Sequence, residues 1–106
     1  LRYLRHPNIV LFYGACLDGQ EMDVILVFEK VIGRTLNRYM DSSPRPPEPN
    51  RIKIMHCIAN GISYLHSSTP AIVHGDLKPE NIFVITDDAN PRSICAKLGD
   101  FGLARR

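Results

Sequence analysis

Four prolines crowded between Asp41 and Pro49 divide this chain of 106 residues into two parts. Proline lacks a backbone N–H, and its ring clashes with the preceding turn of a helix. For this reason we expect neither a helix nor a central strand to cross the stretch, and we predict an exposed loop from Asp41 to Pro49. The chain must build one set of elements before this loop and another set after it.

Two apolar runs dominate the part before the loop. Residues Ile9–Tyr13 form the first run, which Gly14 closes, and residues Val24–Phe28 form the second. Both are rich in β-branched and aromatic residues, which favour strands, and the second run is apolar on both faces, which favours burial. The Asp18-Gly19 pair between them is a turn signal. The pattern predicts an antiparallel hairpin with a buried second strand.

Helical patterns come next. A short helix is expected over Leu36–Met40, with Thr35 as its N-cap. A longer helix is expected from Asn50, its candidate N-cap, to His66. The apolar residues of the longer helix share one face and are Ile54, Met55, Ile58, Ile62 and Leu65. Gly61 inside this helix costs about 1 kcal/mol relative to alanine, which predicts close packing against a neighbouring segment at that point.

Short strands are predicted for the rest of the chain. They cover Ala71–Val73, Ile82–Ile85 and Cys95–Leu98, with a polar turn over Asp87–Arg92 between the last two. The predicted order is thus two strands, two helices and three short strands. Such an order, with the strands in separate groups, is typical of an α+β fold.

Composition argues against several functional classes. A net charge of +2 without a basic cluster gives no support for nucleic-acid binding. The longest strongly apolar run, Val24–Phe28, falls far short of the ~20 residues of a membrane span, so we expect no membrane segment within this chain. Three widely spaced cysteines (Cys16, Cys57 and Cys95) give no disulfide or zinc pattern. We expect reduced, mostly buried thiols in a cytoplasmic protein.

Two polar segments contain the residues suited to chemistry. One is His74–Asn81, which reads HGDLKPEN, and the other contains Asp100, 19 residues after Asn81. Phosphoryl transfer from ATP requires positioning, a carboxylate to meet the proton of the attacking hydroxyl, and a cation near the phosphoryl group. Asp76 could serve as the base and Lys78 as the cation. Magnesium prefers oxygen ligands, which Asn81 and Asp100 could supply.

These segments resemble those of the eukaryotic protein kinase family. HGDLKPEN is similar to the catalytic loop H-R-D-L-x-x-x-N, and Asp100-Phe101-Gly102 is the DFG motif unchanged. The resemblance runs along the whole chain and implies a fragment of the two-lobed kinase fold. Residues 1–28 would be the end of the N-lobe, residues 29–33 the hinge, and residues 34–106 the start of the C-lobe through the DFG motif.

The same resemblance implies roles for the residues of the two segments. Asp76 would orient the substrate hydroxyl and accept its proton, and Lys78 would contact the γ-phosphate of ATP. Asn81 and Asp100 would hold Mg²⁺. The substrate would be a protein serine or threonine, because Lys78-Pro79-Glu80 is typical of serine/threonine kinases.

An adenine site is implied as well. The backbone of Glu29 and Val31 would hydrogen-bond the base, Phe28 would be the gatekeeper behind it, and Phe83 would form its floor. His74 and Phe101 would stack with Phe12 in a hydrophobic column that links the two lobes.

The subgroup within the kinase family and the alternative functions are inferred from fewer residues than the family itself. The segment Arg5–Cys16 looks most like the tyrosine-kinase-like group, particularly Raf-like kinases. Gly75 stands where most of the family has an arginine that pairs with a phosphorylated activation loop, which implies that this switch is absent or works differently. A His-Gly-Asp loop is also found in small-molecule phosphotransferases of the aminoglycoside and choline kinase type.

A pseudokinase that acts as a scaffold is the second alternative, because the family's strand lysine lies upstream of Leu1. The family's Gly-rich loop also lies upstream of Leu1, and its A-P-E segment lies downstream of Arg106. We therefore expect the isolated chain to be poorly stable and inactive, and the full-length protein to be the enzyme.

Overall fold

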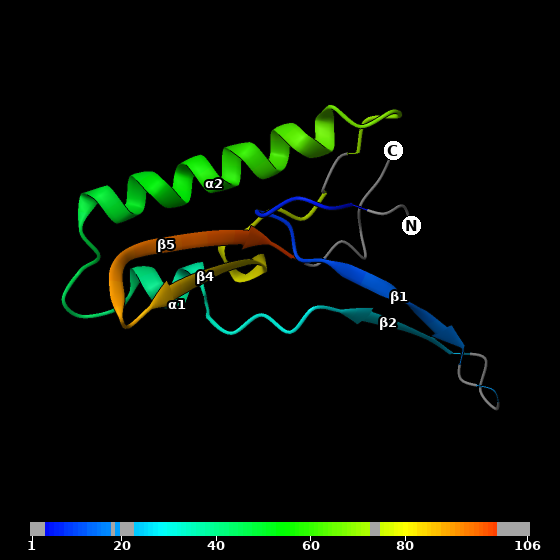
Figure 1. Cartoon of the computed structure of the whole chain (residues 1–106), viewed down its shortest axis with the longest axis horizontal. Helices are drawn as coiled ribbons and strands as arrows, with labels where there is room; N and C mark the ends of the chain where they lie inside the picture. The colour runs from blue at the N-terminus through cyan, green and yellow to red at the C-terminus, as the bar shows by residue number, and fades with distance from the viewer. Residues whose placement is uncertain (1–3, 18, 20–22, 73–74, 100–106) are drawn as a thin grey trace.

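The computed structural model describes residues 4–17, 19, 23–72 and 75–99 (Figure 1). No helix within these ranges combines the length and the apolar character needed to cross a bilayer. The elements in chain order are β1 (Phe12–Leu17), β2 (Val24–Phe28), β3 (Arg34–Thr35), α1 (Leu36–Met40), α2 (Glu48–His66), the 3-10 helix η1 (Pro79–Asn81), β4 (Ile82–Asp87) and β5 (Asn90–Leu98). This mixed α and β composition agrees with the predicted α+β class.

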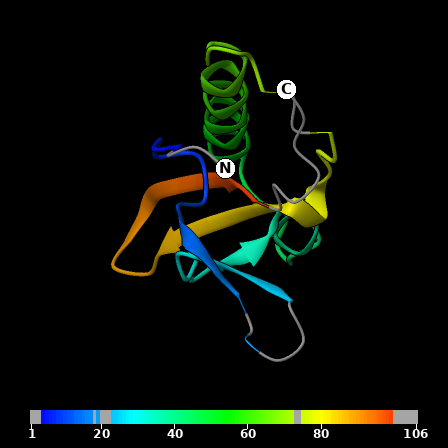
Figure 2. The same ribbon diagram turned by 90° about the vertical axis from the view of Figure 1, so that its right-hand side faces the viewer.

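Two separate antiparallel sheets organise the chain. Strands β1 and β2 form a two-stranded sheet, and strands β3, β4 and β5 form a three-stranded sheet in that order. Helix α2 lies along one side of the β4–β5 pair, and α1 lies on the other side (Figures 1 and 2). The β1–β2 hairpin extends away from this layered part in both views.

The predicted hairpin is present, but its first strand begins later than the sequence suggests. Strand β1 starts at Phe12 rather than Ile9, and it continues through Gly14, where we had placed its end. The reason is a long-range pairing. Ile9 forms a parallel bridge with Leu98, and the Val10 N–H donates to the Leu98 carbonyl oxygen at 2.9 Å. The start of the apolar run therefore joins β5 instead of the hairpin.

The prediction that the second strand is buried is wrong. Strand β2 has the predicted bounds, yet Val24 is 59% exposed and Ile25 is 52% exposed. Within the described residues no helix packs on either face of the β1–β2 sheet (Figure 1). A strand that is apolar on both faces is buried only when another layer covers it.

Helix α2 begins two residues earlier than predicted. Its N-cap is Pro47 rather than Asn50, and Pro49 lies in its first turn. Proline is accepted there because the first N–H groups of a helix have no partner within the helix. The loop before α2 is correspondingly shorter than Asp41–Pro49. It is also not uniformly exposed, since Pro46 is buried.

The core lies between α2 and the three-stranded sheet. From α2, Ile54 and Leu65 are buried, as predicted, and they join Val84 and Leu98 of the sheet. Met55 is 69% exposed, against our prediction, because it lies next to Ile54 in sequence and so points about 100° around the helix from it.

The predicted close approach at Gly61 is confirmed. A Cβ atom built there would lie 3.0 Å from Leu98 Cδ1 and 3.1 Å from the Asn8 carbonyl oxygen. The glycine inside α2 therefore lets the helix lie against β5 and against the segment before β1.

Strand β5 is longer than predicted. It starts at Asn90 rather than Cys95, because the turn after β4 is tight and the Ala89 N–H donates to Asp87 Oδ1 at 2.9 Å. The predicted strand over Ala71–Val73 is absent at Ala71 and Ile72, and Val73 lies outside the described residues. Helix α1 has its predicted bounds and N-cap residue, although the Thr35 side chain makes no capping hydrogen bond.

The three cysteines are free thiols. Cys57 and Cys95 are half-buried, whereas Cys16 is exposed on the β1–β2 hairpin. The expectation that the thiols are mostly buried is therefore wrong for Cys16, because the sheet that carries this residue is uncovered.

Candidate active site

Three of the predicted catalytic residues form one cluster just before β4. The Asn81 side-chain amide donates to the Asp76 carbonyl oxygen at 2.8 Å and to Asp76 Oδ2 at 3.0 Å. Lys78 Nζ lies 3.7 Å from Asp76 Oδ1. Asn81 is only 8% exposed, while Asp76 and Lys78 are more open to solvent. The cluster therefore combines a carboxylate, a cation and a buried amide that holds the carboxylate in place.

Local sequence explains why this segment adopts its shape. A residue before proline is restricted to extended conformations, and Lys78 has φ −152° and ψ 162° before Pro79. Proline then suits the first position of η1. Asn81 closes that turn through its N–H, which donates to the Lys78 carbonyl oxygen at 2.9 Å.

Gly75 has a backbone conformation that side chains rarely adopt. Its φ of 85° lies in the left-handed region, which glycine enters without steric cost. Because Gly75 directly precedes Asp76, this turn sets the direction in which the chain enters the cluster. Replacing the usual arginine of the family with glycine thus has a conformational consequence as well as the loss of charge.

Oxygen atoms of this cluster match the chemistry of a magnesium ligand set. Both hydrogen bonds from Asn81 to Asp76 use the nitrogen of the amide, so its carbonyl oxygen is the atom suited to a cation. The other predicted ligand, Asp100, lies outside the described residues. Within the described ranges, no group of three or more His, Cys, Asp or Glu side chains is arranged to hold a metal ion.

The four residues predicted to surround adenine line one cavity. It has a volume of about 290 Å³, and its lining consists of Val10, Phe28, Glu29, Val31, Phe83 and Gly99. Sequence reasoning missed Val10 and Gly99. Val10 was assigned to a strand in the hairpin, and no role in the site was predicted for Gly99, although its position directly before the DFG motif is a signal that could have found it.

A backbone hydrogen bond connects this cavity to the catalytic cluster. The Gly99 N–H donates to the Asn81 carbonyl oxygen at 2.8 Å. Gly99 lines the cavity and Asn81 holds Asp76, so the two halves of the candidate site share this contact.

The Glu29 side chain is held by an ion pair that the sequence did not indicate. Its Oε1 accepts hydrogen bonds from Lys97 Nζ at 2.9 Å and from the Leu11 N–H at 2.8 Å. Burial tends to raise the pKa of Glu29, but the Lys97 hydrogen bond, the Leu11 N–H and the Lys97 charge outweigh it, so this pKa lies below its usual value. Lys97 also pairs across the sheet with Phe83, which places the ion pair beside the cavity.

The predicted hydrophobic column stays a prediction, because His74 and Phe101 lie outside the described residues. Its third member, Phe12, packs against Phe28, with ring centroids 5.4 Å apart. This contact was not predicted from the sequence. Phe28, the candidate gatekeeper, therefore packs against a side chain of the neighbouring strand in its own hairpin.

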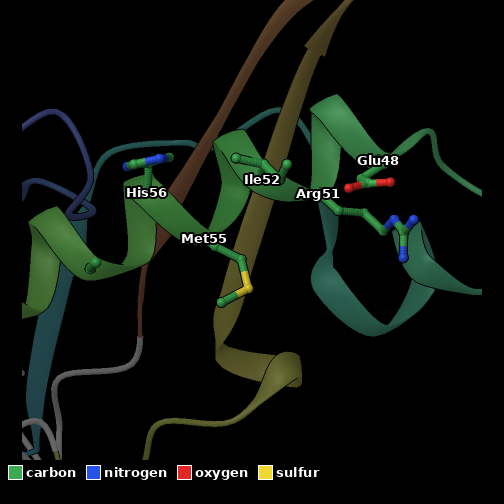
Figure 3. Close-up of a pocket in the computed structure, with 6 residues that line it drawn as sticks. Glu48, Arg51, Ile52, Met55 and His56 are labelled. Atoms are coloured by element: carbon green, nitrogen blue, oxygen red, sulfur yellow. The ribbon is translucent and has the colours of Figure 1, made fainter.

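A second and larger cavity of about 720 Å³ lies on α2. Its lining residues, drawn in Figure 3, come from this one helix and are Glu48, Arg51, Ile52, Met55, His56 and Ala59. None of the predicted site residues contributes to it. We therefore place the candidate active site at the cavity between Phe28 and Phe83.

Comparison with known proteins identifies the family of this chain. Residues 1–106 match the family model of the protein kinase domain. A dual specificity protein kinase of Dictyostelium discoideum is 39% identical over 115 residues, covering 99% of this chain and 5% of that protein. A G-type lectin S-receptor-like serine/threonine-protein kinase of Oryza sativa subsp. indica is 38% identical over 101 residues, covering 94% of this chain and 12% of that protein.

A serine/threonine-protein kinase of Arabidopsis thaliana is 34% identical over 102 residues, covering 96% of this chain and 22% of that protein. The chain thus spans between 5% and 22% of the length of these relatives. Because the family match extends from the first residue to the last, this chain belongs to the protein kinase family.

Proposed function

We propose that the full-length protein transfers the γ-phosphoryl group of ATP to a serine or threonine hydroxyl of a protein substrate. One observation carries this proposal. The Asn81 amide holds the Asp76 carboxylate beside the Lys78 ammonium, next to a cavity of a size suited to a nucleotide base. Phosphoryl transfer requires a positioned carboxylate and a nearby cation, and it requires little other chemistry from the protein.

Each residue of the cluster has a proposed role. The Asp76 carboxylate orients the attacking hydroxyl and accepts its proton. The Lys78 ammonium stabilises the negative charge that spreads over the transferred phosphoryl group. Asn81 fixes the Asp76 carboxylate and, with Asp100, offers oxygen ligands to Mg²⁺. When bound, magnesium would neutralise phosphate charge.

The cavity residues have proposed roles in nucleotide binding. The backbone of Glu29 and Val31 would hydrogen-bond adenine, with Phe28 behind the base and Phe83 beneath it. Because the Glu29 side chain is turned toward Lys97, it leaves the backbone of Glu29 as the part that meets the base.

Two observations support serine and threonine as acceptors. Lys78-Pro79-Glu80 is the serine/threonine form of the catalytic loop, and two of the relatives described above are named serine/threonine-protein kinases. Another relative is named a dual specificity kinase, so the acceptor is to be measured directly. The likeness of Arg5–Cys16 to Raf-like kinases supports placement in the tyrosine-kinase-like group.

Asp76→Asn in the full-length protein tests the proposal. Removing the base should lower the rate of phosphate transfer from labelled ATP to a protein substrate by about 10²–10⁴-fold. Asp88→Asn, at an exposed position in the turn after β4, is the matched control and should leave the rate unchanged. Hydrolysis of the labelled product should release phosphoserine or phosphothreonine. Undiminished transfer by Asp76→Asn would overturn the proposed mechanism, and phosphotyrosine as the main product would overturn the acceptor assignment.

A further inference from the structure

Gly99 meets the aromatic ring of Phe83 so closely that no side chain fits between them. A Cβ atom built on Gly99 would lie 2.6 Å from Phe83 Cε2 and 3.2 Å from Phe83 Cδ2. The backbone of Gly99 is outside the left-handed region, so its conformation alone would allow other residues. The ring of Phe83, rather than the backbone, therefore excludes a side chain at position 99.

Strand pairing explains why these two residues meet. Phe83 lies opposite Lys97 in the β4–β5 pair, and Gly99 follows Lys97 by two residues. Positions two apart along an extended chain share one face, and diagonal neighbours across a strand pair remain within reach of an aromatic ring. Ile82 and Val84, on either side of Phe83, are buried in the core instead. Phe83 and Gly99 thus share the cavity side of the sheet.

Both residues line the cavity of about 290 Å³ that also contains Phe28 and Val31 in its wall. A methyl group at position 99 would have to displace the Phe83 ring or the strand end. The strand end is fixed by the hydrogen bond from the Gly99 N–H to the Asn81 carbonyl oxygen at 2.8 Å. The half-buried ring is the part that can move, and it forms one wall of the cavity.

We propose that Gly99 determines how a nucleotide base fits this cavity by allowing the Phe83 ring to lie against the end of β5. The proposal rests on the proposed function, because it concerns the nucleotide site of the same kinase. Gly99 acts through Phe83 and is therefore a positioning residue. A side chain at 99 is compatible with the cavity only when residue 83 is smaller than phenylalanine.

A double-mutant cycle in the full-length protein tests this coupling. The variants are Gly99→Ala, Phe83→Leu and the combination of the two, and Gly19→Ala is the matched control because a Cβ there meets no described atom within 4 Å. Two quantities are measured for each protein: the Kd for ATP with magnesium, by calorimetry, and the midpoint of thermal unfolding. Only the first quantity depends on the proposed function.

We expect Gly99→Ala to raise the Kd for ATP by about tenfold and to lower the unfolding midpoint, because overpacking at one point displaces a neighbour. In the Phe83→Leu background the same change should alter the Kd by less than about threefold, because the leucine leaves room for the methyl group. Gly19→Ala should leave both quantities unchanged.

Additive effects of the two substitutions on both quantities would overturn the coupling. Coupling in thermal unfolding without coupling in the Kd would overturn the role in base binding. If the unmodified protein does not bind ATP while the unfolding midpoints are coupled, the proposed function fails and the steric relation of Gly99 to Phe83 stands.

Discussion

The two hairpins of this chain have the same architecture and very different surroundings. In β4–β5, Ile82, Val84 and Leu98 are buried in one cluster with Ile54 and Leu65 of α2. In β1–β2, Leu17 is 74% exposed and Val24 is 59% exposed. Strand propensity is similar in both, so the difference arises from what packs on each sheet. The comparison teaches that strand-forming residues are enough for two strands to pair, whereas the burial of their side chains depends on a second layer packed against the sheet.

The sharpest test of this comparison uses two leucines. Leu98→Ala should lower the free energy of unfolding by about 3 kcal/mol, because this side chain is fully buried and truncation leaves a cavity. Leu17→Ala should change it by less than about 0.5 kcal/mol, because its side chain is exposed. Denaturant unfolding of the full-length protein measures both. Equal losses at the two positions would show that another part of the protein covers the β1–β2 sheet.

A smaller effect is expected at the turn that precedes the catalytic cluster. Gly75→Ala should lower the free energy of unfolding by roughly 1–2 kcal/mol, because alanine is disfavoured at a φ of 85°. Gly19→Ala in the β1–β2 connection is the control, since its Cβ meets no described atom within 4 Å and its φ lies outside the left-handed region. If both alanine variants are equally stable, the left-handed conformation of Gly75 is not required.

The smallest expected effect concerns the ion pair between Glu29, which directly follows β2, and Lys97 of β5. Glu29 accepts a hydrogen bond from Lys97, and its pKa in the folded state lies below the ordinary value of 4.5. The stability from this pair is therefore present above pH 4.5 and is lost as the pH falls through the lower folded-state pKa.

Glu29→Gln should lower the free energy of unfolding by about 1 kcal/mol at neutral pH and by less at acidic pH. Thermal unfolding at a series of pH values measures this difference. A loss that does not shrink toward acidic pH would mean that the contact contributes through packing and not through the charge of Glu29.

Local patterns predicted much of the fold. The bounds of β2 and α1 follow from short runs of residues, and the contact at Gly61 follows from a glycine inside a helix. Long-range contacts explain most errors. Strand β1 starts late because Ile9 pairs with Leu98, which no pattern near Ile9 could indicate. The prediction that Met55 lies on the buried face of α2 was wrong, because adjacent residues on a helix face different directions.

In the candidate site, too, features set by local sequence were predictable and those set by long-range contacts were not. The grouping of Asp76, Lys78 and Asn81 was predictable because all three lie in one short segment. Two other contacts were not predictable from the sequence: that of Gly99 with Phe83 and the ion pair of Glu29 with Lys97. Each contact depends on how segments far apart in the sequence are aligned. Such alignment is set by packing over the whole sheet and not by the residues in contact.

The pairing of β4 with β5 has one more consequence. Phe83 lies opposite Lys97, and alternate residues of β4 face opposite sides of the sheet. A slip of β4 by a single residue would bring Ile82 to the nucleotide side and send the phenylalanine into the hydrophobic interior. Correct registration of this ladder during folding is thus a precondition for any recognition of a base by this domain.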